Sequence, residues 1–145
     1  MRHQRVALVF AASALAALVT AAPVRAHHAF AAEFDSTQPI TLRGAVTKVE
    51  WINPHTWIHL DVKDSSGKVI EWMIEGGTPN TLLRRSVDKN SLPAGTEIVV
   101  EGYRAKNGTN RANGRDLTLP SGRKLFLGSS GTGAPADGRD PSEAK

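Results

Sequence analysis

Histidine offers the most distinctive chemistry in this sequence, because the chain of 145 residues contains no cysteine. Without a thiol it cannot form disulfides, cysteine-ligated zinc or iron–sulfur centres, or a thiol nucleophile. Imidazole is then the strongest nitrogen ligand that the chain offers to a transition metal. One histidine, His3, lies at the very start of the chain. The predicted metal ligands are the other four, namely His27, His28, His55 and His59.

Residues 1–26 have the three-part pattern of a secretory signal peptide. Arg2 and Arg5 precede an almost entirely apolar stretch over residues 6–22, and the small residues Val24 and Ala26 suit a signal peptidase. An uncleaved membrane anchor is the alternative, but the apolar stretch is at or below the roughly 18 to 20 residues that cross a bilayer. The sequence therefore predicts a periplasmic protein that is exported and cleaved after Ala26.

Cleavage after Ala26 would make His27 the first residue, with a free α-amine beside its ring. These two nitrogens can chelate one metal ion, and copper(II) prefers such donors in tetragonal geometry. One more imidazole, from His28, His55 or His59, would complete the T-shaped arrangement called a histidine brace. The predicted cofactor is therefore copper or another divalent metal, and otherwise none. In the alternative interpretation the histidines beside the cleavage site are incidental, His55 bonds to backbone in a turn and His59 is a solvated strand residue.

The remaining residues show short strand patterns separated by turn signals. The expected strands cover residues 40–52, 56–62, 69–75, 96–103, 115–119 and 124–127, with a short helix over 81–86. Gly44 is expected to bend the first strand, and Asn107-Gly108 and Asn113-Gly114 to form turns in the loop before residue 115. The expected organisation is a signal peptide over 1–26, an N-terminal segment over 27–40, a folded domain over 41–128 and a disordered tail over 129–145.

Three consecutive strands, a short helix and two or three further strands follow the element order of an OB-fold. A sheet of this size must close on itself or pack on another sheet to protect its edges. The sequence therefore predicts an all-β domain, a small OB-like Greek-key barrel of five to six strands with one short helix. A small sandwich would give similar sequence signals.

OB-fold ligands usually bind the outer face of the second and third strands. Period-two alternation assigns to that face Trp57, His59, Asp61, Glu71, Met73 and Glu75. Glu71, Glu75 and Met73 are predicted to support the metal ligands. Trp57 and Asp61 are predicted to complete a ligand-binding face, and aromatic packing is the alternative for Trp57.

Charge argues against nucleic acid and membrane as partners. The chain has 18 basic and 14 acidic residues, and three of the basic ones lie in the leader, so the mature protein is nearly neutral. No apolar stretch after the leader is long enough to hold the mature chain in a membrane. The expected partner is therefore an unidentified periplasmic protein or a small ligand.

The two halves of the mature chain differ in charge. Residues 33–75 hold seven acidic and four basic residues, whereas residues 102–127 hold six basic and one acidic residue. The basic loop around Arg104, Arg111 and Arg115 is predicted to bind an anionic ligand or an acidic partner. A solvated loop without a partner is the alternative.

No catalytic motif accompanies these residues. The sequence has no Gly-x-Ser-x-Gly elbow, no His-Glu-x-x-His pair and no phosphate-binding glycine loop. It therefore favours a binding or accessory protein over an enzyme, with metal binding through the N-terminal histidine as the leading function. The alternative is an interaction module that uses the barrel face and the basic loop without metal.

Five blocks distinguish the mature chain. They are His27-His28-Ala29-Phe30, Val49-Glu50-Trp51-Ile52-Asn53-Pro54-His55, Gly77-Thr78-Pro79-Asn80, Glu101 to Gly108 and Leu119 to Phe126. In combination they resemble a family of small exported proteobacterial proteins that is classed only as a domain of unknown function. The resemblance covers nearly all of residues 27–128. It implies a stand-alone periplasmic domain, and it implies no activity, cofactor or catalytic residue.

Overall fold

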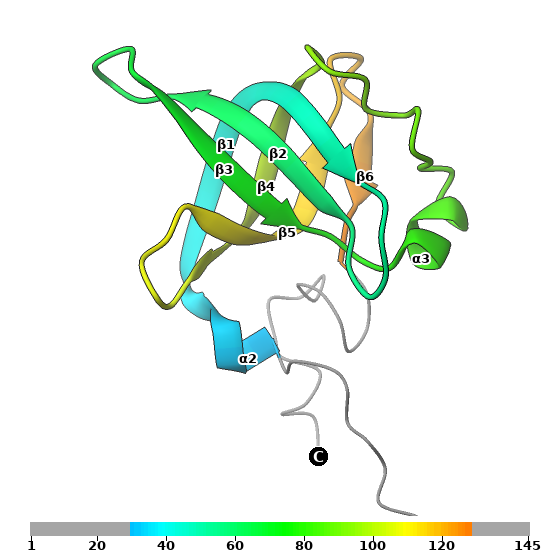
Figure 1. Cartoon of the computed structure of the whole chain (residues 1–145), viewed down its shortest axis with the longest axis horizontal. Helices are drawn as coiled ribbons and strands as arrows, with labels where there is room; N and C mark the ends of the chain where they lie inside the picture. The colour runs from blue at the N-terminus through cyan, green and yellow to red at the C-terminus, as the bar shows by residue number, and fades with distance from the viewer. Residues whose placement is uncertain (1–29, 129–145) are drawn as a thin grey trace, which may run out of the picture.

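A computed structural model of the chain describes residues 30–128. The elements in chain order are α2 (Phe30–Glu33), β1 (Phe34–Glu50), β2 (Trp57–Lys63), β3 (Val69–Glu75), α3 (Pro79–Leu83), β4 (Glu97–Ala105), β5 (Arg111–Thr118) and β6 (Lys124–Phe126), as Figure 1 shows. The predicted signal peptide, the histidines at positions 27 and 28 and the predicted tail over 129–145 lie outside the described residues. The prediction of an all-β fold is confirmed.

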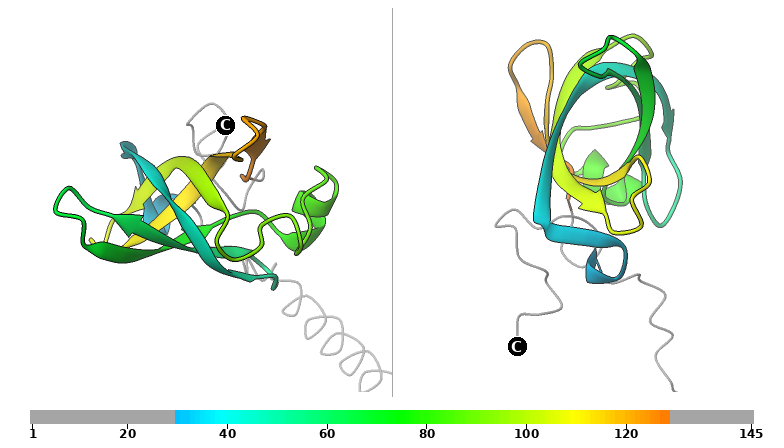
Figure 2. Two further views of the ribbon diagram at one scale, coloured as in Figure 1. Left: turned by 90° about the horizontal axis from the view of Figure 1, so that it is seen from above. Right: turned by 90° about the vertical axis from the view of Figure 1, so that its left-hand side faces the viewer.

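The strands form one six-stranded sheet in the order β3-β2-β1-β4-β5-β6. Neighbours in this order are antiparallel. An additional parallel pairing joins β3 to β5, with Met73 opposite Arg111 and Glu75 opposite Asn113. The pairings that start at β1 therefore pass through β2, β3, β5 and β4 and return to β1. Figure 2 shows these strands curving round a common interior, with β6 outside it.

Alternating apolar side chains of the strands fill that interior. In β2, Ile58 and Leu60 are 1% and 0% exposed, and their partners across the ladder are the buried Ile74 and Trp72. This alternation is the one that the sequence predicts, because every second side chain of a strand points to the same face. Each fully buried aliphatic side chain stabilises the fold by about 1.5–3 kcal/mol relative to an exposed one.

Strand β1 is longer than predicted, because it begins at Phe34 rather than at residue 40. Its first part pairs with β4 and its last part with β2, and Gly44 lies where it faces both neighbours. A Cβ atom at Gly44 would lie 2.1 Å from the carbonyl oxygen of Asp61. Glycine is therefore required there for β1 and β2 to approach this closely.

The prediction of a turn at Asn113-Gly114 is wrong, because both residues lie inside β5. Asn113 is 1% exposed, and a Cβ atom on Gly114 would lie 2.9 Å from side-chain atoms of both Ile74 and Leu127. This dipeptide thus serves tight packing across β3 and β5 rather than a turn. The turn between β4 and β5 uses the other predicted dipeptide, with Gly108 at a φ of 75°.

Helix α3 begins two residues earlier than predicted and ends three residues earlier. Thr78 is its N-cap, since its side-chain oxygen accepts a hydrogen bond of 3.1 Å from the backbone nitrogen of Thr81. Pro79 occupies the first turn, where its missing N–H costs nothing. Ser86 has a φ of 59°, and the following Val87 donates a backbone hydrogen bond to Leu82, which ends the helical segment.

Candidate functional site

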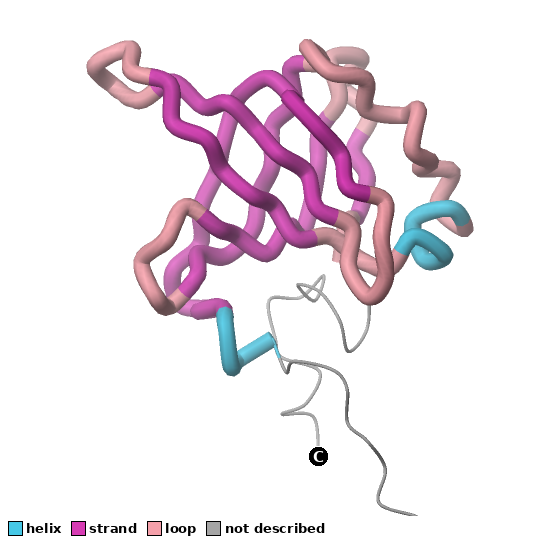
Figure 3. The backbone as a smooth tube through the Cα atoms, viewed as in Figure 1, coloured by secondary structure: helices cyan, strands magenta, loops and turns pink. Residues whose placement is uncertain are grey.

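A cavity of about 220 Å³ lies between α2, the loop from β1 to β2, and the ends of β2, β3 and β5. Figure 3 shows α2 and this loop at the lower end of the sheet, away from the loop between β2 and β3. The apolar part of the wall consists of Phe30, Phe34, Ile52, Pro54 and Trp57. The side chains that give the wall its polar character include Glu33, His55, Glu75, Arg111 and Asn113. We call this space the His55 cavity.

An aromatic cluster fixes α2 at the edge of the cavity. The Phe30 ring lies 5.9 Å from that of Phe34 and meets Tyr103 edge-to-face at 5.5 Å, measured between centroids. All three rings are buried and form a core cluster separate from the main one. Aromatic pairs of this kind contribute about 0.5–1.5 kcal/mol beyond area burial. Lys106 ties the helix further, since its backbone nitrogen donates to the Glu33 carbonyl at 2.9 Å.

His55 and Glu75 form a buried pair on the polar wall. They are 8% and 7% exposed, and Nδ1 of His55 lies 2.9 Å from Oε1 of Glu75. This contact is an ion pair when the His55 ring is protonated. The Glu75 carboxylate raises the pKa of His55, and burial of the ring opposes it in part.

The parallel pairing of β3 with β5 supplies the neighbour of this pair. It places Asn113 opposite Glu75, and Nδ2 of Asn113 donates to Oε1 of Glu75 at 3.5 Å. The amide oxygen of Asn113 accepts no hydrogen bond among the described residues, and neither does the buried hydroxyl of Thr56 take part in one. Polar atoms that are buried without partners are rare in folded proteins.

Arg111 covers the outward-facing ring of Trp57. Its guanidinium carbon lies 4.6 Å from the ring centroid, a cation–π contact. Nη2 of Arg111 lies 3.7 Å from Oε2 of Glu33, which links β5 to α2 across the cavity. The buried Nε of Arg111 has no hydrogen-bond acceptor within residues 30–128.

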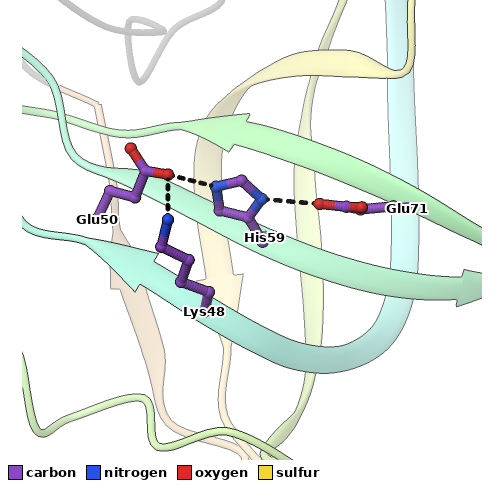
Figure 4. A network of polar contacts seen from close by, with 4 residues as sticks. All are labelled: Lys48, Glu50, His59 and Glu71. Carbon is purple, nitrogen blue, oxygen red and sulfur yellow. Dashed lines mark hydrogen bonds and ion pairs between the residues drawn. The ribbon is translucent and has the colours of Figure 1, made fainter.

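His59 belongs to a different group of side chains, which we call the His59 cluster (Figure 4). Nδ1 of His59 lies 2.9 Å from Oε1 of Glu71, and Nε2 lies 3.0 Å from Oε1 of Glu50. Lys48 donates from Nζ to the same Glu50 oxygen at 2.7 Å. Both ring nitrogens of His59 therefore already face a carboxylate.

The structure thus brings His55 to Glu75 and His59 to Glu71, but it gives the two histidines different partners. The described part of the chain holds no group of three or more histidine, aspartate or glutamate side chains placed to bind a metal ion. Met73 lies opposite His59 on one side and Arg111 on the other, and Asp61 lies opposite Glu71.

The three arginines predicted to bind an anionic partner lie in strands and not in a loop, because β4 and β5 extend further than predicted. Arg104 stacks over the Trp72 ring at 5.3 Å. Arg115 donates from Nε to Asp116 at 2.7 Å, and this carboxylate raises the pKa of Arg115. An anionic partner for these residues stays a prediction.

Phe30 and Glu33 of α2 and Asn113 of β5 line the cavity, although no sequence pattern assigns them to a site. Asn113 was hidden by its turn-like dipeptide, and the contact of β3 with β5 joins residues 38 positions apart. The block of residues 49–55 was the available signal, since its end at His55 enters the cavity wall.

These observations describe a small all-β domain with one buried polar pair beside a cavity. The chain belongs to a family of unknown function (DUF6152), whose family model covers residues 14–114. The resemblance to such a family is therefore confirmed. No curated protein and no solved structure matches the chain. Among the described residues, no helix is both long enough and apolar enough to cross a membrane.

Proposed function

We propose that the chain is a periplasmic metal-binding domain with an OB-like barrel fold, exported and cleaved after Ala26. The circuit of pairings from β1 through β2, β3, β5 and β4 supports the barrel, and so does the position of α3 between β3 and β4. A sheet closed in this way exposes no long unpaired edge. The leader pattern of residues 1–26 supports export.

One observation carries the metal proposal: His55 and Phe30 line the same cavity, and Phe30 follows His27 by three residues. A chain spans at most about 3.3–3.6 Å per residue, so three residues reach no further than about 11 Å. A segment of this length could carry the α-amine and ring of His27 to the cavity that His55 lines. Copper(II) is the proposed ion, because it tops the divalent affinity order and prefers nitrogen ligands.

The amine and ring of His27 bind the ion as a chelate, and His55 adds the third nitrogen. Glu75, which contacts the His55 ring at 2.9 Å, orients that ring as carboxylates beside metal ligands commonly do. His59 has no role, because both of its nitrogens face other carboxylates.

The test is a copper(II) titration of the protein recovered after expression of the full chain. Mass spectrometry identifies its first residue, and calorimetry and EPR follow binding. We expect one copper ion per chain with nitrogen hyperfine structure. His27→Ala and His55→Ala should each weaken binding by at least about tenfold, since even residues that only orient ligands cost 10–100-fold.

His59→Ala is the matched control, because it removes an imidazole from β2, four residues after His55, and His59 does not line the cavity. It should leave copper affinity unchanged. Unchanged binding after His27→Ala, or in a protein that retains an extra N-terminal methionine, would rule out the brace. Loss of binding in His59→Ala but not in His55→Ala would rule out the cavity as the site.

A further inference from the structure

The wall of the His55 cavity has more hydrogen-bonding capacity than its own side chains use. Among residues 30–128, the amide oxygen of Asn113 is a buried acceptor without a donor, and Nε of Arg111 is a buried donor without an acceptor. Both residues line the cavity, and Asn113 is 1% exposed. Buried polar groups in folded proteins are nearly always paired. Two unpaired atoms of opposite kind on one wall therefore indicate a ligand that offers both an N–H and an oxygen.

The charged side chains of the wall already face one another in opposite pairs. His55 lies 2.9 Å from Glu75, and Arg111 lies 3.7 Å from Glu33. A charged organic ligand, which unlike a metal ion forms no coordinate bond to the His55 ring, would bring an unbalanced charge into a partly buried site or separate one of these pairs, and both changes are costly. A ligand without net charge avoids them.

The rest of the wall is aromatic and suits a flat apolar body. Phe30, Phe34 and Trp57 line it, and the first two are held in place by their mutual contact at 5.9 Å. Ligand sites generally combine such a wall with a few placed polar groups. A volume of about 220 Å³ restricts the ligand to a small molecule.

We infer that the His55 cavity binds a small neutral molecule with a carboxamide group and an aromatic body. The amide N–H donates to Oδ1 of Asn113, and the amide oxygen accepts from Nε of Arg111. The ring stacks among the aromatic side chains. This inference goes beyond the proposed metal function and requires no residue before Phe30.

The experiment compares three probes with one ring and different charges: benzamide (neutral), benzoate (anionic) and benzamidine (cationic). Protein recovered after expression of the full chain is held in EDTA, and binding is followed by backbone amide NMR shifts. We expect benzamide to bind with a dissociation constant of about 1 mM or lower, as befits a very small ligand. Benzoate and benzamidine should bind at least roughly tenfold more weakly, since each disturbs a charge pair.

Two variants test the polar contacts. Arg111→Lys keeps the positive charge but removes Nε, and Asn113→Leu removes the amide oxygen; each should weaken benzamide binding by roughly tenfold. Arg104→Lys is the matched control, because Arg104 also stacks on a tryptophan but does not line the cavity. If Asn113→Leu fails to fold, the comparison of Arg111→Lys with Arg104→Lys decides the question.

Three results would overturn the inference. They are equal or tighter binding of either charged probe, shift changes confined to residues outside the cavity, and no binding of benzamide up to its solubility limit. Because EDTA removes metal, these results are independent of the copper titration, and failure of copper binding would leave them standing.

Discussion

The His55 cavity and the His59 cluster use the same two residue types with opposite outcomes. In the cavity, a histidine and a glutamate are both about nine-tenths buried, and neighbouring polar atoms lack partners within the described part of the chain. In the cluster, the His59 ring lies between two carboxylates, and the side chain of Glu71 is 63% exposed. In the His59 cluster the ring nitrogens already have partners, so they are not available to a ligand. In the His55 cavity, polar atoms beside the buried pair are still available for hydrogen bonds to a ligand.

The same comparison explains which contacts matter for stability. A charge pair shielded from water interacts strongly, and loss of one member leaves the other buried without compensation. An ion pair at the surface contributes little, because water and salt screen it. Substitutions and pH changes in the two regions should show this difference.

Glu75→Ala and Glu71→Ala should differ most. Loss of Glu75 leaves the buried His55 ring without its ion-pair partner and the Asn113 amide without its acceptor, and we expect it to lower the free energy of unfolding by about 3 kcal/mol. Loss of Glu71 should cost less than about 0.5 kcal/mol, since its side chain is mostly exposed. Urea denaturation of both variants measures the difference, and equal losses would contradict the distinction between the two regions.

Phe30→Ala should lower the free energy of unfolding by about 2 kcal/mol. This is below the 3–5 kcal/mol typical of a Phe→Ala change, because Phe30 belongs to the small aromatic cluster and α2 is a single turn at the edge of the sheet. It should also open the cavity without altering the His59 cluster. Denaturation measures the first effect, and unchanged NMR shifts of Glu50 and Glu71 check the second.

The pH dependence of stability should follow the His55–Glu75 pair. The Glu75 carboxylate raises the pKa of His55 in the folded protein, so the folded state binds this proton more tightly than the unfolded state. The resulting stabilisation is complete below the unfolded histidine pKa of about 6.5 and is lost as the pH rises through the higher folded pKa. The stability difference between the unmodified protein and Glu75→Gln, measured in metal-free buffer, should therefore shrink as the pH rises above about 6.5. A difference that grows with pH would show the opposite sign.

Lys48→Ala should give the smallest effect. Its side chain is 63% exposed, and its Nζ lies 2.7 Å from Oε1 of Glu50 in the His59 cluster. We expect no measurable change in the denaturation midpoint at 0.15 M salt, roughly the physiological ionic strength at which such pairs are screened. A destabilisation as large as that of Phe30→Ala would mean that the cluster is a structural core element.

The sequence predicts β2 and β3 well because their pattern is local. Ile58 and Leu60 alternate with polar residues, and the bounds of β3 agree with the expected range. The first residues of β1 are not predicted by the sequence because residues 35–39 are polar or proline. This part of β1 joins the sheet through Phe34 and Pro39, whose partners in β4 are more than 60 positions away. A local sequence pattern cannot predict pairing with residues so far away in the chain.

The candidate site was predictable only in part. Histidine chemistry pointed to His55, and strand alternation placed Glu75 among the candidates. The contact between His55 and Glu75 depends on the path of the loop over residues 51–56. The contact of Asn113 with Glu75 depends on the parallel pairing of β3 with β5. Both are long-range features, so sequence periodicity could supply the residues but not their convergence.

The parallel contact between β3 and β5 joins only three residue pairs, fewer than any other link in the circuit that starts and ends at β1. It is thus the seam along which the sheet would first separate. Glu75 lies on one side of this seam and Asn113 on the other, so a molecule that binds in the cavity and contacts both would hold the two strands together. Slower hydrogen exchange of the amides along the seam would then report occupancy of the cavity even when nothing else in the fold moves.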